Sequence, residues 1–167
     1  MNEPDLGMRA AEILSALLYA NIATASDNLP WNTPVTAVPA ANLDLYWSSW
    51  TEAVHSKNIH ANPDIFVTYY DSTRARGTNN HRCLYLRCRA VVVSDPDEAI
   101  AAHELIYPGA PVGLDDFFGV GLRRFYRARP IQAWLNCLSE QQLQPGTLDM
   151  RVEVSLAAIR RAFQASD

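Results

Sequence analysis

The segment that most constrains the fold is residues 82–93, RCLYLRCRAVVV, in which apolar and polar side chains alternate. In an extended chain, successive side chains point to opposite faces. One face would carry the apolar residues Leu84, Leu86, Cys88, Ala90 and Val92. The other face would carry Tyr85, Arg87 and Arg89. A strand with one apolar and one polar face is typical of an antiparallel sheet that covers a core on one side.

Several other segments have the composition of strands, and most follow one another without a helix between them. They are residues 21–38, as a hairpin around Asp27-Asn28-Leu29-Pro30, then 43–47, 64–70, 149–156 and 123–138, the last as two strands that meet near Pro130. About seven strands without regular strand–helix alternation disfavour a doubly wound parallel sheet. We expect a mainly antiparallel β-barrel with flanking helices.

Three or four helices accompany these strands. Apolar residues recur at helical spacing near the N-terminus, at Ala10, Ile13, Leu14, Leu17 and Leu18. Residues 157–163 predict a short basic helix, and residues 114–122 a short helix or a loop. Residues 95–107 predict a further helix, in which Asp95 caps the first turn, Pro96 takes the first position and Glu98 returns a capping-box bond.

Length and composition indicate one domain, residues 1–167, with a substantial core. Hydrophobic residues make up 49% of the chain, its formal net charge is -4, and no linker or repeat divides it. A mildly acidic chain gives no support for nonspecific nucleic-acid binding. The most apolar window, residues 10–23, is interrupted by polar residues and is shorter than the roughly 20 residues of a membrane span. We therefore expect neither nucleic acid nor a membrane as a partner.

The cysteines and histidines do not form a recognisable metal site. The three cysteines, Cys83, Cys88 and Cys137, contain no CxxC pair, which indicates reduced thiols in a cytoplasmic protein. The spacing of the four histidines is not typical of a zinc site; they are His55, His60, His81 and His103. Because no Ser-His-Asp arrangement is evident either, we name no metal ligand and no catalytic residue.

Ser56 and Lys57 lie in the connection between two predicted strands, within WSSWTEAVHSKNIHANPDIFVTYYDS, residues 47–72. If a helix begins at Ser56, its free N–H groups and dipole would form a phosphate site with the hydroxyl and the ammonium group. The alternative is an ordinary serine cap beside a solvated lysine. A helix that begins earlier, at Thr51, would place Ser56 inside it and weaken the phosphate interpretation.

Aromatic and hydroxyl-bearing residues lie just upstream, at Trp47, Ser48, Ser49 and Trp50. Flat rings and hydroxyl donors suit a planar, hydrogen-bonding ring with a phosphate tail. Aromatic residues in strands belong to the core more often than to a cofactor site, so both interpretations stay open at this stage.

The order of these segments resembles the pyridoxamine 5'-phosphate oxidase-like family of FMN-binding split barrels, from about Ile13 to Leu156. The resemblance rests on ANIATASDNLPWNTPVTAV, LYWSSWTEAVHSKNIHANPDIFVTYYDS, LYLRCRAVVVSDPDEA, and FYRARPIQAWLN with DMRVEV. It implies an antiparallel split β-barrel, an FMN cofactor, and a homodimer with the cofactor at the subunit interface. The simplest activity is that of an oxidoreductase that transfers hydride through the flavin N5.

The resemblance also implies roles for individual residues. Asn32, Thr33, Pro34 and Val35 would follow the flavin ring and ribityl chain, and Trp47, Ser48 and Ser49 would lie beside the isoalloxazine. Ser56 and Lys57 would bind the phosphate, and Trp134 would reach the cofactor from the partner subunit.

Departures from the family pattern bear on the substrate. The opening strand has no arginine, and the segment that contains Asp149 and Arg151 has no neighbouring histidine, which argues against pyridoxamine phosphate. A flavin-dependent reductase or oxidase of another small molecule fits better. One alternative is a haem- or flavin-binding protein without turnover, with His60 or His81 as a haem ligand. Another is a relative that binds a deazaflavin.

A last feature is a group of arginines in the segment 123–129. The group comprises Arg123, Arg124, Arg127 and Arg129. A solvated or dimer-pairing face is the first interpretation, and a site for a substrate anion is the second.

Overall fold

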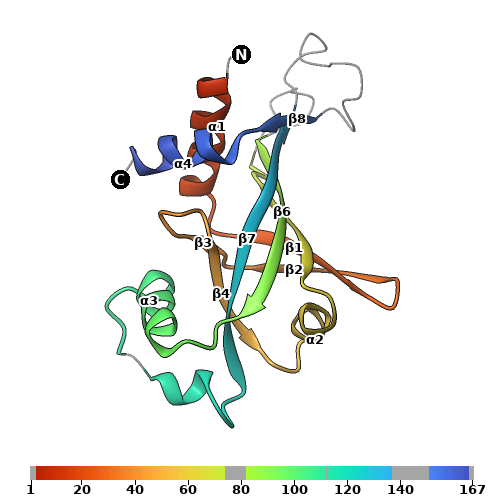
Figure 1. Ribbon diagram of the computed structural model, residues 1–167, viewed down its shortest axis with the longest axis vertical. Coiled ribbons are helices and arrows are strands. Elements are labelled where there is room, and N and C mark those ends of the chain that lie inside the picture. Colours follow the sequence, from red (N-terminus) through yellow and green to blue (C-terminus); the bar gives the residue numbers. More distant parts are fainter. Residues whose placement is uncertain (1–2, 74–81, 112, 137–150, 166–167) are drawn as a thin grey trace.

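The computed structural model describes residues 3–73, 82–111, 113–136 and 151–165 (Figure 1). The strands are β1 Ala20–Ser26, β2 Leu29–Val35, β3 Val38–Pro39, β4 Leu45–Trp50, β5 Asp64–Tyr70, β6 Cys83–Val92, β7 Arg123–Asn136 and β8 Arg151–Val154. The helices are α1 Glu3–Ala16, α2 Val54–Ala61, α3 Pro96–Ile106, α4 Leu156–Gln164 and the 3₁₀ helix η1 Leu114–Phe117.

The strands form one eight-stranded sheet in the order β2-β1-β5-β6-β7-β4-β3, with β8 paired to β7, and every pairing is antiparallel. The sheet curls into a half-barrel (Figure 1). The expected split β-barrel with flanking helices is therefore confirmed. The alternation is confirmed from Leu84 to Ala90, because Leu84, Leu86, Cys88 and Ala90 are buried whereas Arg87 and Arg89 are exposed. It does not extend to Val92, which was predicted on the apolar face but is exposed, whereas Val93 is buried.

β7 corrects the prediction of two strands that meet near Pro130. It is one continuous strand of 14 residues that pairs with β6 along most of its length. Pro130 lies where β7 lacks a second neighbour, because pairing with β4 stops at Ala128 and pairing with β8 starts at Ala133. The β6 register also shifts here, which leaves Ile131 as an extra residue. Proline is tolerated in a strand at such an edge or bulge, because no ladder hydrogen bond is lost.

The β1–β2 hairpin turns more tightly than the four-residue turn predicted. Asp27 and Asn28 connect Ser26 directly to Leu29, with φ angles of 52° and 62°. Two central residues with positive φ are typical of a type I′ turn, whose twist matches that of the flanking strands. Asparagine and aspartate tolerate this conformation better than other residues with a Cβ.

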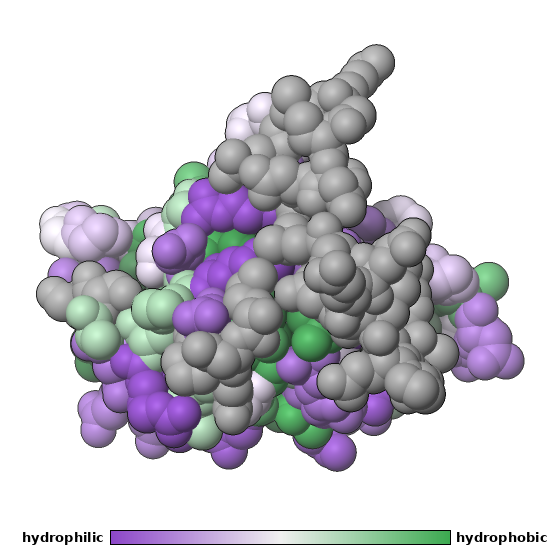
Figure 2. Space-filling view, turned by 90° about the horizontal axis from the view of Figure 1, so that it is seen from above, coloured by the Kyte–Doolittle hydropathy of each residue, from purple (hydrophilic) through white to green (hydrophobic). Residues whose placement is uncertain are grey.

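α1 and α4 lie side by side at one end of the molecule and close the main core (Figure 1). Figure 2 looks onto this end and shows hydrophilic and hydrophobic residues intermixed over the described surface. The main core joins Ile13 of α1 and Ile159 of α4 to the inward-facing residues of the strands. Among the described residues, no helix is long and apolar enough to cross a membrane.

α3 packs over a second, smaller core that includes Phe117 and Phe125. As predicted, the Asp95 side chain accepts a hydrogen bond from the Glu98 amide, at 2.8 Å, and Pro96 opens the helix. Glu98, however, does not complete a capping box. Its carboxylate accepts hydrogen bonds from Tyr46, at 2.9 Å, and from Arg127, at 2.6 Å, so that it ties α3 to β4 and β7.

The contact between α1 and α4 depends on the absence of a side chain at Gly7. A Cβ at Gly7 would lie 2.8 Å from the carbonyl oxygen of Ala158. We expect Gly7→Ala to lower the free energy of unfolding by about 1–3 kcal/mol, because the added methyl group overpacks this contact. In a helix without such a contact, alanine would instead be more stable than glycine by about 1 kcal/mol. Urea denaturation measures the change.

Met8→Ala is the matched control, because Met8 is 52% exposed on the same helix. Its free energy of unfolding should stay within about 0.5 kcal/mol of the parent value. A more stable Gly7→Ala protein would contradict the close approach of α1 and α4.

Candidate functional site

Two pockets flank the first turn of α2. The first, here called the β4 pocket, has a volume of about 420 Å³ and is lined by Thr33, Pro34, Val35, Thr36, Ser48, Ser49, His55, Ile106, Tyr107 and Arg123. The second, here called the α2 pocket, has a volume of about 310 Å³ and is lined by Thr51, Ser56, Lys57, His60, Val92, Arg124 and Tyr126. They share no lining residue.

The β4 pocket brings together five of the residues for which the resemblance implies contact with the flavin. Thr33, Pro34 and Val35 come from the end of β2, and Ser48 and Ser49 come from β4. These two strands lie far apart in the sheet order, and the curl of the half-barrel brings them to one pocket. Asn32, the first residue of the same predicted run, is exposed and does not line the pocket.

Two short hydrogen bonds organise the wall formed by β4. Ser49 Oγ lies 2.6 Å from His55 Nε2, and Ser48 Oγ lies 2.6 Å from the Tyr107 hydroxyl. His55 is buried, and this burial lowers the pKa of its imidazole below the ordinary 6.5. The imidazole is therefore neutral at pH 7, and it presents one donor and one acceptor to its surroundings.

Ser56 and Lys57 line the α2 pocket instead. The helix begins at Val54, between the two starts considered from the sequence, and its N-cap Ala53 makes no side-chain capping bond. Ser56 is thus the third helical residue, and its hydroxyl donates to the Trp50 carbonyl at 2.6 Å. Lys57 forms an exposed ion pair with Glu52 at 2.9 Å. Both side chains already have partners, although an exposed pair of this kind exchanges readily.

Neither of the two predicted tryptophans lines the β4 pocket or the α2 pocket within this chain. The Trp47 ring is 1% exposed, stacks on Tyr126 at 5.5 Å between centroids, and belongs to the main core. Trp134 lies near the opposite end of β7 from the β4 pocket, paired with Tyr85 and stacked on Phe66.

The four arginines of β7 do not form one cluster. Arg123 lines the β4 pocket and Arg124 the α2 pocket, whereas Arg127 binds Glu98 and Arg129 binds Asp44. Arg124 donates to the carbonyl oxygens of Gly119, Gly121 and Arg123. For Arg123, no hydrogen bond or ion pair of its guanidinium occurs within the described part of the chain. Arg123 is exposed, and it brings to the β4 pocket a positive charge that no described residue pairs with.

Sequence reasoning did not place His55, Tyr107 and Arg123 beside the cofactor, although Arg123 belonged to the arginine group for which an anion site was the second interpretation. His55 was grouped with the histidines whose spacing is not typical of a zinc site, and only its approach to Ser49 in space reveals it. Tyr107 follows α3, about 60 residues from the serine that it contacts. Arg123 could have been separated from Arg124, because adjacent residues of a strand face opposite sides.

Of the histidines that the structure describes, His60 and His103 do not line the β4 pocket. His60 is exposed and lines the α2 pocket, and His103 is buried among Tyr107, Phe117 and Phe125. His81, Cys137 and Asp149 lie outside the described residues. Within residues 3–73, 82–111, 113–136 and 151–165, no group of three or more histidine, cysteine or acidic side chains is arranged to hold a metal ion.

Burial of His55 predicts a pH dependence of stability. Because its pKa is lower in the folded protein than the ordinary 6.5, the unfolded chain binds the proton more tightly, and the free energy of unfolding falls as the pH drops below about 6.5. We expect His55→Gln to have a smaller difference between pH 7.5 and pH 5.5 in urea denaturation than the parent protein.

His60→Gln serves as the control, because His60 is exposed on the same helix. It should retain the pH dependence of the parent. If His55→Gln and the parent lost stability equally on acidification, the neutral, buried imidazole would be ruled out.

Comparisons with known proteins address the fold of the chain. No protein-family model and no curated protein matches the sequence. Solved structures match over most of its length. A haem-binding protein from Mycobacterium smegmatis has a TM-score of 0.70 at 14% identity, over 96% of this chain and 62% of that one. The chain thus spans less than two thirds of that protein.

Two further structures extend the likeness. A candidate pyridoxamine 5'-phosphate oxidase from Listeria innocua has a TM-score of 0.57 at 18% identity, over 77% of this chain and 95% of that one. An FAD-binding protein from Mesorhizobium loti has a TM-score of 0.52 at 17% identity, over 75% and 90%. The chain therefore has the split-barrel fold that the resemblance predicted, in common with candidate pyridoxamine 5'-phosphate oxidases and FAD-binding proteins.

Proposed function

We propose that the chain is a cytoplasmic, homodimeric FMN-binding flavoprotein that acts as an oxidoreductase on a small molecule. The observation that carries the proposal is the convergence of the ends of β2 and β4 on the β4 pocket, in a fold whose neighbours include FAD-binding and haem-binding proteins. Its volume of about 420 Å³ lies in the range typical of small-molecule sites.

The chemistry of the β4 pocket fits a flavin. Pro34, Val35 and Ile106 offer apolar surface to a planar ring. The Thr33 hydroxyl offers hydrogen bonds to the polar edge of the ring and to the ribityl chain. Ser48 and Ser49, which are bound to Tyr107 and His55, would contribute the hydrogen-bonding capacity that each hydroxyl retains beside that bond. Such a combination of apolar walls and a few oriented polar groups is typical of cofactor sites.

Arg123 is an alternative to Ser56 and Lys57, the residues that the resemblance implies for binding the phosphate. The Ser56 hydroxyl is bound to a backbone carbonyl and Lys57 pairs with Glu52, whereas Arg123 has no partner in the described chain. Among the described residues that line the β4 pocket, Arg123 is the only one with a charged side chain. We therefore assign the phosphate to Arg123, because a guanidinium group binds phosphate through two parallel hydrogen bonds.

The position of Trp134 supports a homodimer. Trp134 lies eleven positions after Arg123 along β7, which corresponds to roughly 35 Å in an extended strand. The role that the resemblance implies for Trp134, contact with the cofactor, thus requires the tryptophan of a second protomer. The same requirement would place the cofactor at the subunit interface.

The protein's part in the reaction would be to bind and orient the cofactor. A bound flavin supplies hydride transfer, and the surrounding protein tunes its electronics. Ser49 and the neutral His55 would hold a fixed hydrogen-bonding pattern against the ligand, and the Ser48–Tyr107 pair would fix the wall next to α3. No described residue is assigned a role as catalytic acid or base.

A haem-binding protein without turnover is the second candidate. It is favoured by the likeness to the haem-binding protein from Mycobacterium smegmatis, which covers 96% of this chain. His60, which is exposed at the α2 pocket, would be the first candidate ligand within the described residues. A deazaflavin in place of FMN is a further alternative within the flavin proposal.

The absorbance spectrum of the freshly purified, untagged protein tests these proposals. We expect the two bands of a flavin, and denaturation should release a ligand with the mass of FMN. A single intense Soret band would establish the haem alternative, and a deazaflavin mass would replace FMN. If the flavin-loaded protein failed to oxidise reduced nicotinamides and other donors at steady state, the proposed cofactor would stand and the proposed oxidoreductase activity would be wrong.

A pair of variants locates the phosphate. We expect Arg123→Ala to weaken FMN binding about tenfold, since one charge-assisted contact at the mouth of the pocket is lost. Lys57→Ala should change the affinity less than about twofold, because Lys57 is paired with Glu52 and lines the other pocket. Flavin fluorescence during titration of the apoprotein gives both dissociation constants.

The opposite result would place the phosphate in the α2 pocket. If Lys57→Ala weakened FMN binding and Arg123→Ala did not, the phosphate would lie with Ser56 and Lys57, and the assignment to Arg123 would be wrong.

A further inference from the structure

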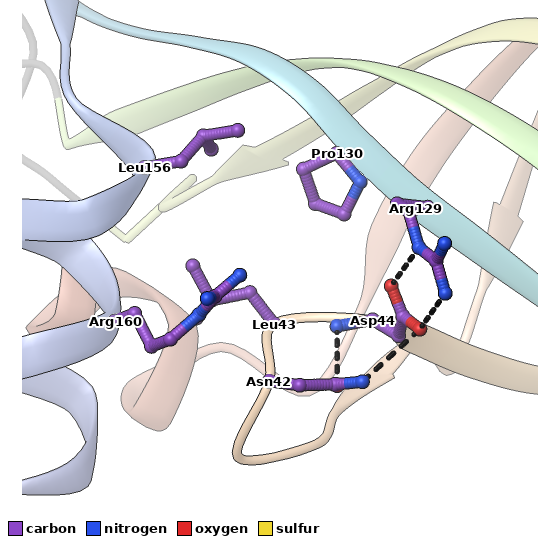
Figure 3. Close-up of a pocket in the computed structure, with 7 residues that line it drawn as sticks. All are labelled: Asn42, Leu43, Asp44, Arg129, Pro130, Leu156 and Arg160. Carbon is purple, nitrogen blue, oxygen red and sulfur yellow. Dashed lines mark hydrogen bonds and ion pairs between the residues drawn. The ribbon is translucent and has the colours of Figure 1, made fainter.

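A third pocket, here called the α4 pocket, lies between the β3–β4 turn, the middle of β7 and the first turns of α4 (Figure 3). Its volume is about 350 Å³. It shares no lining residue with the β4 pocket or the α2 pocket, so a ligand there would be additional to the proposed flavin. We propose that the α4 pocket binds a small organic anion that has a carboxylate group and an apolar body.

A buried carboxylate fixes the rim of the α4 pocket. Asp44 is 3% exposed, and its two oxygens accept hydrogen bonds from Arg129 Nε and Nη2, both at 3.2 Å, and from the Asn42 side chain at 3.1 Å (Figure 3). Asn42 also accepts from the Asp44 amide at 2.9 Å. The turn between them holds Leu43 at a φ of 72°, an uncommon conformation that only a well-determined surrounding maintains. The rim is thus built before any ligand arrives.

The charge balance of the α4 pocket favours an anion. Two guanidinium groups, those of Arg129 and Arg160, and one carboxylate line it, so its net charge is positive although that of the whole chain is -4. The Asp44 carboxylate is occupied by Arg129. Arg160 has no hydrogen-bond or ion-pair partner among the residues that the structure describes, and its side chain extends from α4 toward Leu43 (Figure 3). Its donors remain available to a ligand.

The rest of the lining fixes the kind of anion. Leu43, Pro130 and Leu156 add apolar surface beside the two arginines (Figure 3). An inorganic ion would leave this surface in contact with water, whereas an organic anion would cover it. A carboxylate also matches the fork of a guanidinium group, which donates two parallel hydrogen bonds. Leu156 opens α4, and the positive end of the helix dipole adds a favourable field.

Benzoate is the probe, because it joins a carboxylate to a flat apolar ring, and benzamide is its neutral counterpart. Each is titrated into the ¹⁵N-labelled protein as purified. We expect benzoate to shift the amide signals of residues 42–44 and 156–160, and Arg160→Ala to weaken its binding at least about fivefold. Arg161→Ala, which removes the neighbouring exposed arginine of α4, should bind benzoate like the parent.

Several results would overturn the proposal. Equal weakening by Arg160→Ala and Arg161→Ala, or equal binding of benzamide, would show that Arg160 does not recognise the carboxylate. Shifts confined to Ser48, Ser49 and Tyr107 would assign benzoate to the β4 pocket. A change in sedimentation of Arg160→Ala without a change in benzoate binding would make this face a protein contact. The amide spectrum of each variant reports independently whether it is folded.

Discussion

The structure depends above all on β7, the strand that joins its parts. β7 pairs with β6 over most of its length, with β4 at its first half and with β8 at its end. Side chains of a strand alternate, and the extra residue Ile131 reverses the alternation along β7. The same strand therefore supplies Phe125 to the core below α3, Ala128 and Leu135 to the main core, and arginines to three pockets. At residues 129–132 β7 pairs with β6 but with neither β4 nor β8, and this allows a proline there without interrupting the strand.

Charged groups on β7 also tie α3 to the barrel. Arg127 lies between the carboxylates of Glu98, at 2.6 Å, and Asp44, at 4.0 Å. Tyr46 donates to the same Glu98 oxygen, and burial together with this hydrogen bond raises the pKa of Tyr46 to about 12. The phenol therefore stays protonated as a donor at neutral pH. Since Tyr107 follows α3, this network fixes one wall of the β4 pocket as well as the rim of the α4 pocket.

The sequence was sufficient for the elements whose signal is local. Alternation from Leu84 to Ala90, the cap at Asp95 and the location of the hairpin turn at Asp27 and Asn28 each have a physical cause within a few residues. The start of α2 was not predictable in this way, because its N-cap is Ala53, which offers no side-chain acceptor. β3 has only two residues and no periodicity. The continuity of β7 across Pro130 depends on which neighbours are absent there, and that is a property of the sheet rather than of the strand.

The candidate site, too, was predicted in part. The resemblance grouped the ends of β2 and β4, and these do share a pocket, but it joined them to Ser56 and Lys57, which face another one. Spacing in a sequence does not indicate whether a donor is already engaged. A lysine paired with glutamate and a serine bound to a carbonyl must exchange partners to bind phosphate, whereas an arginine without a partner gains a contact and loses none. The decisive quantity is therefore the availability of each donor in the folded chain, and this favours Arg123 for the phosphate of the flavin and Arg160 for a second anion.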